Sequence, residues 1–196
     1  MLVPAEESEL ISATEQTKYR SGVGKLMHLH RKSRPEIKNA VRDLSRWVSG
    51  ASEKHVRAMY RVMRYCLGTP ERGLVIKPNC RWNGSRDFEF EVTGISDSDY
   101  AKCPSTRKSV TGFSVFLCGA VVTTKSKMQP VVALSVTEAE TIAAVDCYQE
   151  MLFVKRILES MGLKVKKPMK LEIDNKGSVD LLHNWSVGGR TRHMDS

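Results

Sequence analysis

No stretch of this 196-residue sequence is apolar for long enough to span a membrane. A membrane-spanning helix needs about 20 consecutive apolar residues, whereas no uninterrupted hydrophobic run here exceeds four residues, as at 131–134 and 151–154. The N-terminus also lacks the succession of charged, apolar and small residues that marks a secretory signal peptide. We therefore expect an intracellular protein without a membrane partner.

Cysteine pairs of the Cys-x-x-Cys type are also absent. The cysteines are odd in number and widely scattered, so they support neither a disulfide framework nor a zinc ribbon, and we expect reduced thiols. They are Cys66, Cys80, Cys103, Cys118 and Cys147. His28 and His30 lie two residues apart and do not share a helix face, which argues against a metal site there.

The sequence does have a basic excess. Its content of 41% hydrophobic and 27% charged residues is typical of a globular protein with a core. The formal net charge is +9, and residues 1–80 carry 15 Lys and Arg against 8 Asp and Glu, whereas residues 81–196 carry 16 against 14. This excess indicates a polyanionic partner, and phosphate backbone is the commonest polyanion inside a cell.

The first part of the chain has helical periodicity. Residues 1–18 are acidic and polar without a period, which predicts a linker or a ragged N-terminus. Helices are predicted over 19–32, 35–49 and 53–67. Basic residues recur on the polar faces of the second and third helices: Lys38, Arg42 and Arg46, and then Arg57, Arg61 and Arg64, which we call the arginine stripe. A single stripe is common on a solvated face, but two stripes favour contact with phosphates.

From Gly73 onward the periodicity becomes that of strands. Short strands are predicted over 74–76, 88–97, 113–118, 120–124, 131–134 and 170–173, and helices over 137–160 and 177–183. Antiparallel strands followed by a helix, a strand and a helix are typical of an α+β or α/β sandwich with a mixed sheet.

Carboxylates stand where these elements begin or end. Asp97 and Asp174 each follow a predicted strand, and Glu138 and Glu140 lie at the start of the long helix. Turn and helix capping is an ordinary alternative for each, and both glutamates match the capping-box pattern. If the two strands are adjacent and parallel, however, their acids meet at one sheet edge. Only one glutamate can face that edge, because the two lie about 200° apart around the helix. A cluster of hard oxygens from separate elements is what a metal-dependent phosphodiesterase requires.

Ordered motifs extend along the chain from Tyr19. The helical part contains Tyr19-Arg20-Ser21-Gly22-Val23-Gly24, Arg34-Pro35-Glu36-Ile37, Leu44-Ser45-Arg46 and Arg61-Val62-Met63-Arg64-Tyr65-Cys66-Leu67-Gly68-Thr69. The later part contains Ser96-Asp97-Ser98-Asp99, Ser105-Thr106-Arg107-Lys108-Ser109-Val110-Thr111-Gly112, Lys125-Ser126-Lys127-Met128-Gln129, Val132-Ala133-Leu134-Ser135-Val136-Thr137-Glu138-Ala139-Glu140, Asp174-Asn175 and Arg190-Thr191-Arg192-His193-Met194-Asp195. Together they resemble the end of the reverse transcriptase and the adjoining ribonuclease H of a copia-type retrotransposon polyprotein.

The resemblance implies two domains. Residues 19–78 are similar to the polymerase segment, thumb or connection, that grips template and primer. Residues 79–196 resemble an α/β (α+β) ribonuclease H-like fold, a mixed sheet of the five-stranded type with flanking helices. In that family three acids, here Asp97, Glu140 and Asp174, are catalytic and hold two Mg²⁺ or Mn²⁺ ions. Glu140 is preferred to Glu138 because Ala139-Glu140-x-Ile142-Ala143 is similar to a stretch of retroviral ribonucleases H.

The function implied is metal-dependent hydrolysis of the RNA strand of RNA–DNA hybrids within the polyprotein, in a cytoplasmic virus-like particle and the nucleus. The partners are then the hybrid and the remainder of the polyprotein, with Arg107 and Lys108 as candidates for backbone contact or as ordinary solvated loop residues. Tyr100 stands where the family usually has Trp, and Thr141 where it has Tyr. The family's final strand and helix, with a fourth acid, are not found before Ser196, so we expect weak activity. The alternatives are a non-catalytic nucleic-acid-binding remnant of a decayed mobile element and a fragment that does not fold alone.

Overall fold

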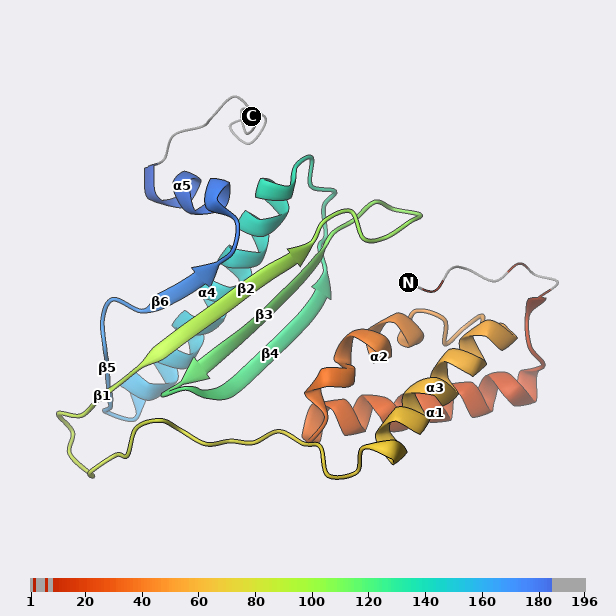
Figure 1. Cartoon of the computed structure of the whole chain (residues 1–196), viewed down its shortest axis with the longest axis horizontal. Coiled ribbons are helices and arrows are strands. Elements are labelled where there is room, and N and C mark those ends of the chain that lie inside the picture. Colours follow the sequence, from red (N-terminus) through yellow and green to blue (C-terminus); the bar gives the residue numbers. More distant parts are fainter. Residues whose placement is uncertain (1, 3–5, 7–8, 185–196) are drawn as a thin grey trace. The chain divides into compact units, whose positions relative to one another are not determined.

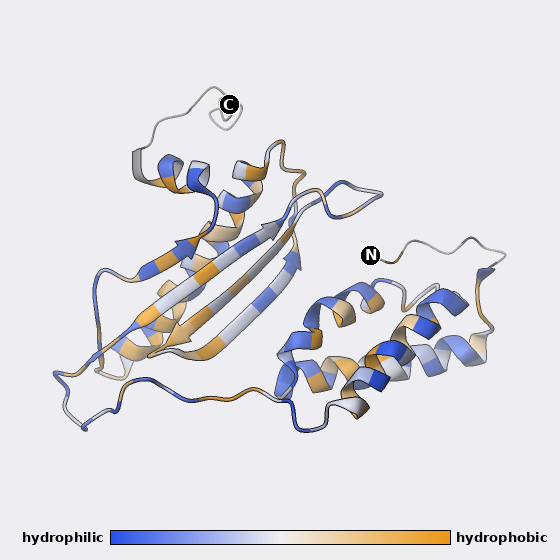
Figure 2. Ribbon diagram, viewed as in Figure 1, coloured by the Kyte–Doolittle hydropathy of each residue, from blue (hydrophilic) through white to orange (hydrophobic). Residues whose placement is uncertain are grey.

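The computed structural model describes residues 2, 6 and 9–184. It divides the chain into two compact units, Met1–Val75 and Ile76–Ser196, which we call the helical unit and the sheet unit (Figure 1). Along the helices of both units, hydrophilic residues interrupt the hydrophobic ones, as expected of helices with one buried face (Figure 2). No helix in the described part of the chain has the length and apolarity needed to cross a bilayer.

The helical unit consists of α1 (Ala13–Lys32), the short 3-10 helix η2 (Pro35–Ile37), α2 (Lys38–Ser45) and α3 (Glu53–Gly68). Helices α1 and α3 approach closely at Gly22, since a Cβ there would overlap Met59 Sδ. The Tyr19 hydroxyl donates to the Leu44 carbonyl at 2.8 Å, and burial raises the pKa of Tyr19 to about 12. The buried core comprises Tyr19, Val23, Leu26, Ile37, Val41, Leu44, Ala51 and Met59.

Two helix boundaries in this unit differ from the sequence prediction. Helix α1 begins at Ala13, so the predicted linker over 1–18 is wrong for residues 13–18. The reason is a capping box, in which Glu15 N–H donates to Ser12 Oγ and Ser12 N–H donates to Glu15 Oε2. The second helix opens as a 3-10 turn and ends at Ser45 rather than at residue 49, and residues 46–49 form turns.

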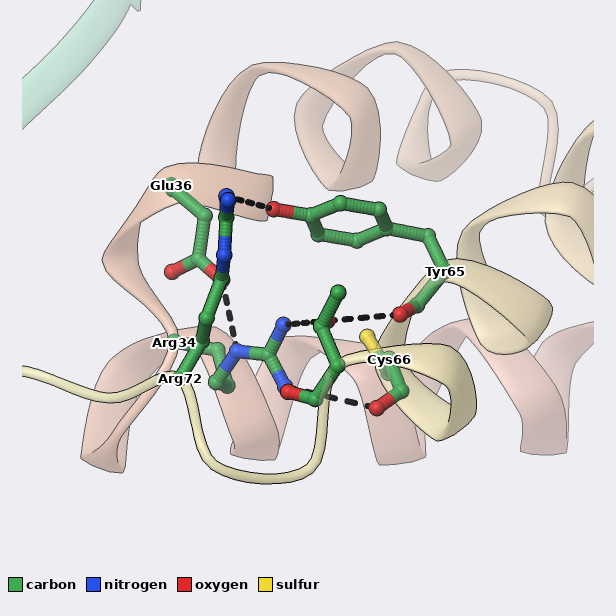
Figure 3. Close-up of polar contacts among 6 residues, drawn as sticks. Arg34, Glu36, Tyr65, Cys66 and Arg72 are labelled. Carbon is green, nitrogen blue, oxygen red and sulfur yellow. Dashed lines mark hydrogen bonds and ion pairs between the residues drawn. The ribbon is translucent and has the colours of Figure 1, made fainter.

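The buried side chain of Arg34 donates hydrogen bonds to the C-terminal end of α3 (Figure 3). This side chain is only 4% exposed, and it donates to the Thr69 carbonyl at 3.0 Å and to Thr69 Oγ1 at 2.7 Å. Glu36 forms an ion pair with the same guanidinium, which also lies over the Tyr65 ring. Carbonyls after the last turn of a helix lack intrahelical donors and attract cations. The Arg34-Pro35-Glu36-Ile37 motif therefore has a structural role in joining η2 to α3.

Up to residue 184, the sheet unit contains in chain order β1 (Glu89–Phe90), β2 (Val92–Asp99), β3 (Val110–Leu117), β4 (Ala120–Met128), α4 (Val136–Ser160), β5 (Lys164–Val165), β6 (Lys170–Ile173) and α5 (Lys176–Asn184). The main sheet has the order β4-β3-β2-β6, in which β2, β3 and β4 are antiparallel and β6 runs parallel to β2. β1 and β5 form a separate parallel pair. This mixed α/β architecture confirms the predicted fold class and is compatible with a ribonuclease H-like fold.

Helix α4 crosses one face of the main sheet (Figure 1). Side chains alternate along β2, so Val92, Gly94 and Ser96 are buried beneath the helix. The helix passes close to Gly94, since a Cβ there would lie 2.6 Å from Met151 Sδ and 2.8 Å from Cys147 Sγ. The packing of α4 thus fixes its start against the end of β2, where the acids lie.

Two predicted strands are not formed, and a third is divided in two. Leu74, Val75 and Ile76 are exposed and form no strand, although Figure 2 shows their apolar character in the segment after α3. Residues 131–134 also form no strand, because Pro130 offers no N–H to a ladder and the next residues lead into the cap of α4. The predicted strand 88–97 is divided, with β1 pairing to β5, a strand that periodicity missed because it has two residues.

The expectation of five reduced thiols is wrong for one pair. Cys80 and Cys118 form a disulfide, while Cys66, Cys103 and Cys147 are free. Cys118 lies in the two-residue turn between β3 and β4, and its carbonyl accepts the Asn79 N–H at 2.7 Å. The two cysteines are 38 residues apart in sequence, so only the approach of residue 79 to this turn brings them together.

Candidate metal centre

The parallel pairing of β2 and β6 places two aspartates at one sheet edge. Ser96 pairs with Ile173 in the last register position, and the next residues are Asp97 and Asp174. Both aspartates are exposed. We predicted that Asp97 and Asp174 would lie at the same sheet edge if their strands were adjacent and parallel. The pairing of β2 with β6 confirms their position at one edge.

Helix α4 adds the third acid. Its N-cap is Ser135, whose Oγ accepts the Glu138 N–H at 3.1 Å, and Glu138 Oε2 in turn accepts the Leu134 N–H at 2.6 Å. Glu138, three residues after the N-cap, thus takes part in capping the start of the helix. Glu140 is 3% exposed and points to the sheet, where its Oε1 accepts the Ser98 N–H at 3.1 Å and the Ser98 hydroxyl at 2.9 Å.

The three acids converge. One carboxylate oxygen from each of Asp97, Glu140 and Asp174 can be chosen so that all three lie within 4.8 Å of one another. Burial raises the pKa of Glu140, and the negative charges of Asp97 and Asp174 raise it further, while the two hydrogen bonds from Ser98 lower it. The cluster therefore concentrates negative charge that needs a counter-charge.

These residues fit a divalent ion. Among the described residues Glu140 Oε2 is buried and has no hydrogen-bond partner, although its sister oxygen has two. Mg²⁺ binds oxygens at about 2.0–2.1 Å in octahedral geometry, which separates its ligand oxygens by about 3–4 Å. The three carboxylate oxygens lie within 4.8 Å of one another, a limit close to this range, so at most small side-chain rotations are needed to bring them around one ion.

Ser98 is a contributor that the sequence analysis missed. It lies between Asp97 and Asp99 on β2, and strand alternation turns it toward α4, on the opposite side from its neighbours. The alternation of side chains along β2 places Ser98 on the opposite face from Asp97 and Asp99. Its contact with Glu140 could be recognised only after the structure showed that α4 covers that face.

The basic residues predicted to bind nucleic acid belong to different elements from the acids. The arginine stripe is exposed on α3 in the helical unit, where Arg57 forms an ion pair with Glu53 at 2.7 Å. Arg107 and Lys108 lie in the loop between β2 and β3, Arg107 exposed and Lys108 donating to the Pro130 carbonyl. By contrast, the three basic residues predicted on the second helix are half-buried and engaged within the protein: Lys38, Arg42 and Arg46.

Comparison with known proteins gives relatives by sequence only, since no family model and no solved structure matches the chain. The Retrovirus-related Pol polyprotein from transposon TNT 1-94 of Nicotiana tabacum is 35% identical over 177 residues, which are 90% of this chain and 13% of that protein. The Retrovirus-related Pol polyprotein from transposon RE1 of Arabidopsis thaliana is 30% identical over 196 residues, or 98% of this chain and 13% of that protein.

A shorter relative is matched over most of its length. The Secreted RxLR effector protein 161 of Plasmopara viticola is 35% identical over 136 residues, which are 69% of this chain and 90% of that protein. The chain spans only 13% of the length of each of the two polyproteins. Over 90% or more of its own length, the chain is therefore similar, at 30–35% identity, to retrovirus-related Pol polyproteins of transposons.

Proposed function

We propose that the sheet unit is a metal-dependent ribonuclease H that hydrolyses the RNA strand of RNA–DNA hybrids within a retrotransposon Pol polyprotein. The observation that carries this proposal is the convergence of Asp97, Glu140 and Asp174 from two strand ends and one helix, with a buried oxygen left unpartnered. The resemblance of the surrounding motifs and the polyprotein relatives support it.

The three carboxylates would hold two Mg²⁺ or Mn²⁺ ions. When bound, such ions activate a water molecule for attack on the phosphodiester and stabilise the departing 3′ oxygen. Asp97 and Asp174 are exposed and can face both solvent and substrate, whereas Glu140 is fixed by Ser98 with one oxygen free. The chain thus supplies one rigid ligand and two accessible ones.

The basic surfaces would bind the hybrid. The arginine stripe presents three exposed guanidinium groups at helical spacing, and Arg107 presents another beside β2. Arginine contacts to phosphates give affinity without sequence preference, and RNA is distinguished through its 2′-hydroxyls across the minor groove. We place this activity inside the cell, in the virus-like particle and nucleus, with the rest of the polyprotein as partner.

Cleavage of a labelled hybrid by the chain with Mg²⁺ or Mn²⁺ tests this function. Asp97→Asn and Asp174→Asn should each abolish cleavage and most metal binding, because each removes a charged ligand from the cluster. Asp180→Asn, a neutralisation on the exposed side of α5, is the matched control and should retain both. Hybrid binding without metal-dependent cleavage would instead favour a non-catalytic nucleic-acid-binding protein.

A further inference from the structure

A buried serine joins the two helices that begin beside the acids. Ser178, in the first turn of α5, is 0% exposed, and its hydroxyl donates to the Thr137 carbonyl in the first turn of α4 at 3.0 Å. Its N–H donates to Asn175 Oδ1 at 2.9 Å, which caps α5. Asn175 directly follows Asp174, and Thr137 lies one helical turn before Glu140.

The contact is also close at Gly177, the residue before the serine. A Cβ on Gly177 would lie 3.2 Å from Thr137 Oγ1 and 3.2 Å from Asn175 Oδ1, so the backbone of α5 touches the start of α4. A glycine at this position permits the approach that the Ser178 hydrogen bond then fixes. The glycine and the Ser178 hydrogen bond therefore both indicate a short distance between the first turns of α4 and α5.

Asp174 needs such a restraint. The ladder between β2 and β6 has four register pairs and ends at Ser96 and Ile173, one residue before the acids. Glu140 is tied to β2 through Ser98, but no strand pairing ties Asp174 to α4. The spacing between Glu140 and Asp174 is therefore set through β2 up to the last ladder pair, and beyond that pair the contact between α4 and α5 adds a second restraint on it.

We propose that Ser178 is a positioning residue that sets the spacing between Asp174 and Glu140, and thereby the affinity of the site for divalent ions. This inference rests on the proposed function, since it assumes that the two acids share a metal centre. Outer-shell hydrogen bonds that orient ligands typically change metal affinity by about 10–100-fold when removed.

Calorimetric titration of the chain with Mn²⁺ tests it. Ser178→Ala removes the hydrogen bond between the helices and should weaken Mn²⁺ affinity about 10-fold. Thr141→Val is the matched control, because the Thr141 hydroxyl donates to the same Thr137 carbonyl at 2.8 Å but within α4. This control should bind Mn²⁺ like the parent, and urea unfolding of both metal-free variants measures the purely structural cost.

A second variant covers the case in which Ser178→Ala does not fold. Gly177→Ala keeps the serine and pushes α5 away from Thr137, so it should also weaken Mn²⁺ binding. Equal affinity of parent, Ser178→Ala and Gly177→Ala, or an equal loss in Thr141→Val, would overturn the positioning role while leaving the metal centre intact. A parent that binds no Mn²⁺ would overturn the proposed function and this inference with it.

Discussion

Replacing Glu140 with Gln should stabilise the metal-free protein and remove its response to metal. The side chain is buried, its pKa is raised by burial and by the two aspartates, and one of its oxygens lacks a partner. Two unit charges 4.8 Å apart interact by about 1 kcal/mol in water and about 3.5 kcal/mol at an effective dielectric constant of 20. Because both aspartates are exposed, the lower figure applies best, and relief of two such repulsions gives about 1–3 kcal/mol.

The amide keeps the observed hydrogen bonds. Its oxygen can still accept from Ser98, and its nitrogen can donate to an aspartate where the carboxylate repelled it. In a domain of this size, 1 kcal/mol raises the melting temperature by about 3–5 °C. Mn²⁺ at 100 times its dissociation constant should stabilise the parent by about 2.7 kcal/mol and the variant far less.

The pH dependence has a defined sign. A glutamate with a raised folded-state pKa binds more protons in the folded state, so stability falls as pH rises from about 4.3 through the raised value. The difference in unfolding free energy between Glu140→Gln and the parent should therefore grow over that window and then level off. Other carboxyl groups, whose pKa values are lowered by ion pairs, contribute equally to the pH dependence of both proteins. Their contributions therefore cancel in the difference.

Urea unfolding and thermal melts with and without Mn²⁺ make the measurement. Glu138→Gln is the matched control, since it neutralises the neighbouring acid that caps α4 and lies outside the cluster. It should keep the full Mn²⁺ stabilisation. A Glu140→Gln variant that is less stable than the parent without metal, yet responds fully to Mn²⁺, would refute the reasoning.

Two further predictions concern the basic surface and the core. Neutralising the arginine stripe should flatten the dependence of log hybrid affinity on log salt by up to about three units, as measured by fluorescence anisotropy, and an unchanged slope would make the stripe an ordinary solvated face. The control neutralises three exposed lysines of α1: Lys18, Lys25 and Lys32. Gly94→Ala should destabilise the sheet unit by about 1–3 kcal/mol in urea unfolding, because the methyl group would overlap Met151 and Cys147. Gly24→Ala, which meets no atom within 4 Å in α1, should instead stabilise its helix by about 0.5–1 kcal/mol; equal effects of the two would contradict the close approach of α4.

Local periodicity and capping signals were sufficient to place several elements. Helices α3 and α4 and strand β6 lie within one residue of their predicted bounds. The repeated apolar face of a helix, or a run of β-forming residues, involves residues close together in sequence and can therefore be recognised from sequence alone. The same signals failed for 74–76 and 131–134, where apolar residues have no strand partner. The sequence prediction also missed the start of α1, although Ser12 and Glu15 have the spacing of a capping box.

The positions of the acids in sequence suggested a cluster but could not establish it. Whether Asp97 and Asp174 meet depends on β6 pairing in parallel with β2, and the choice of Glu140 over Glu138 as their neighbour depends on which face α4 turns to the sheet. The Cys80–Cys118 disulfide and the contact between Ser178 and Thr137 likewise join residues far apart in sequence. Hydrophobic periodicity records which face of an element is buried, whereas pairing and docking depend on the energies of contacts between distant segments, which only the tertiary structure decides.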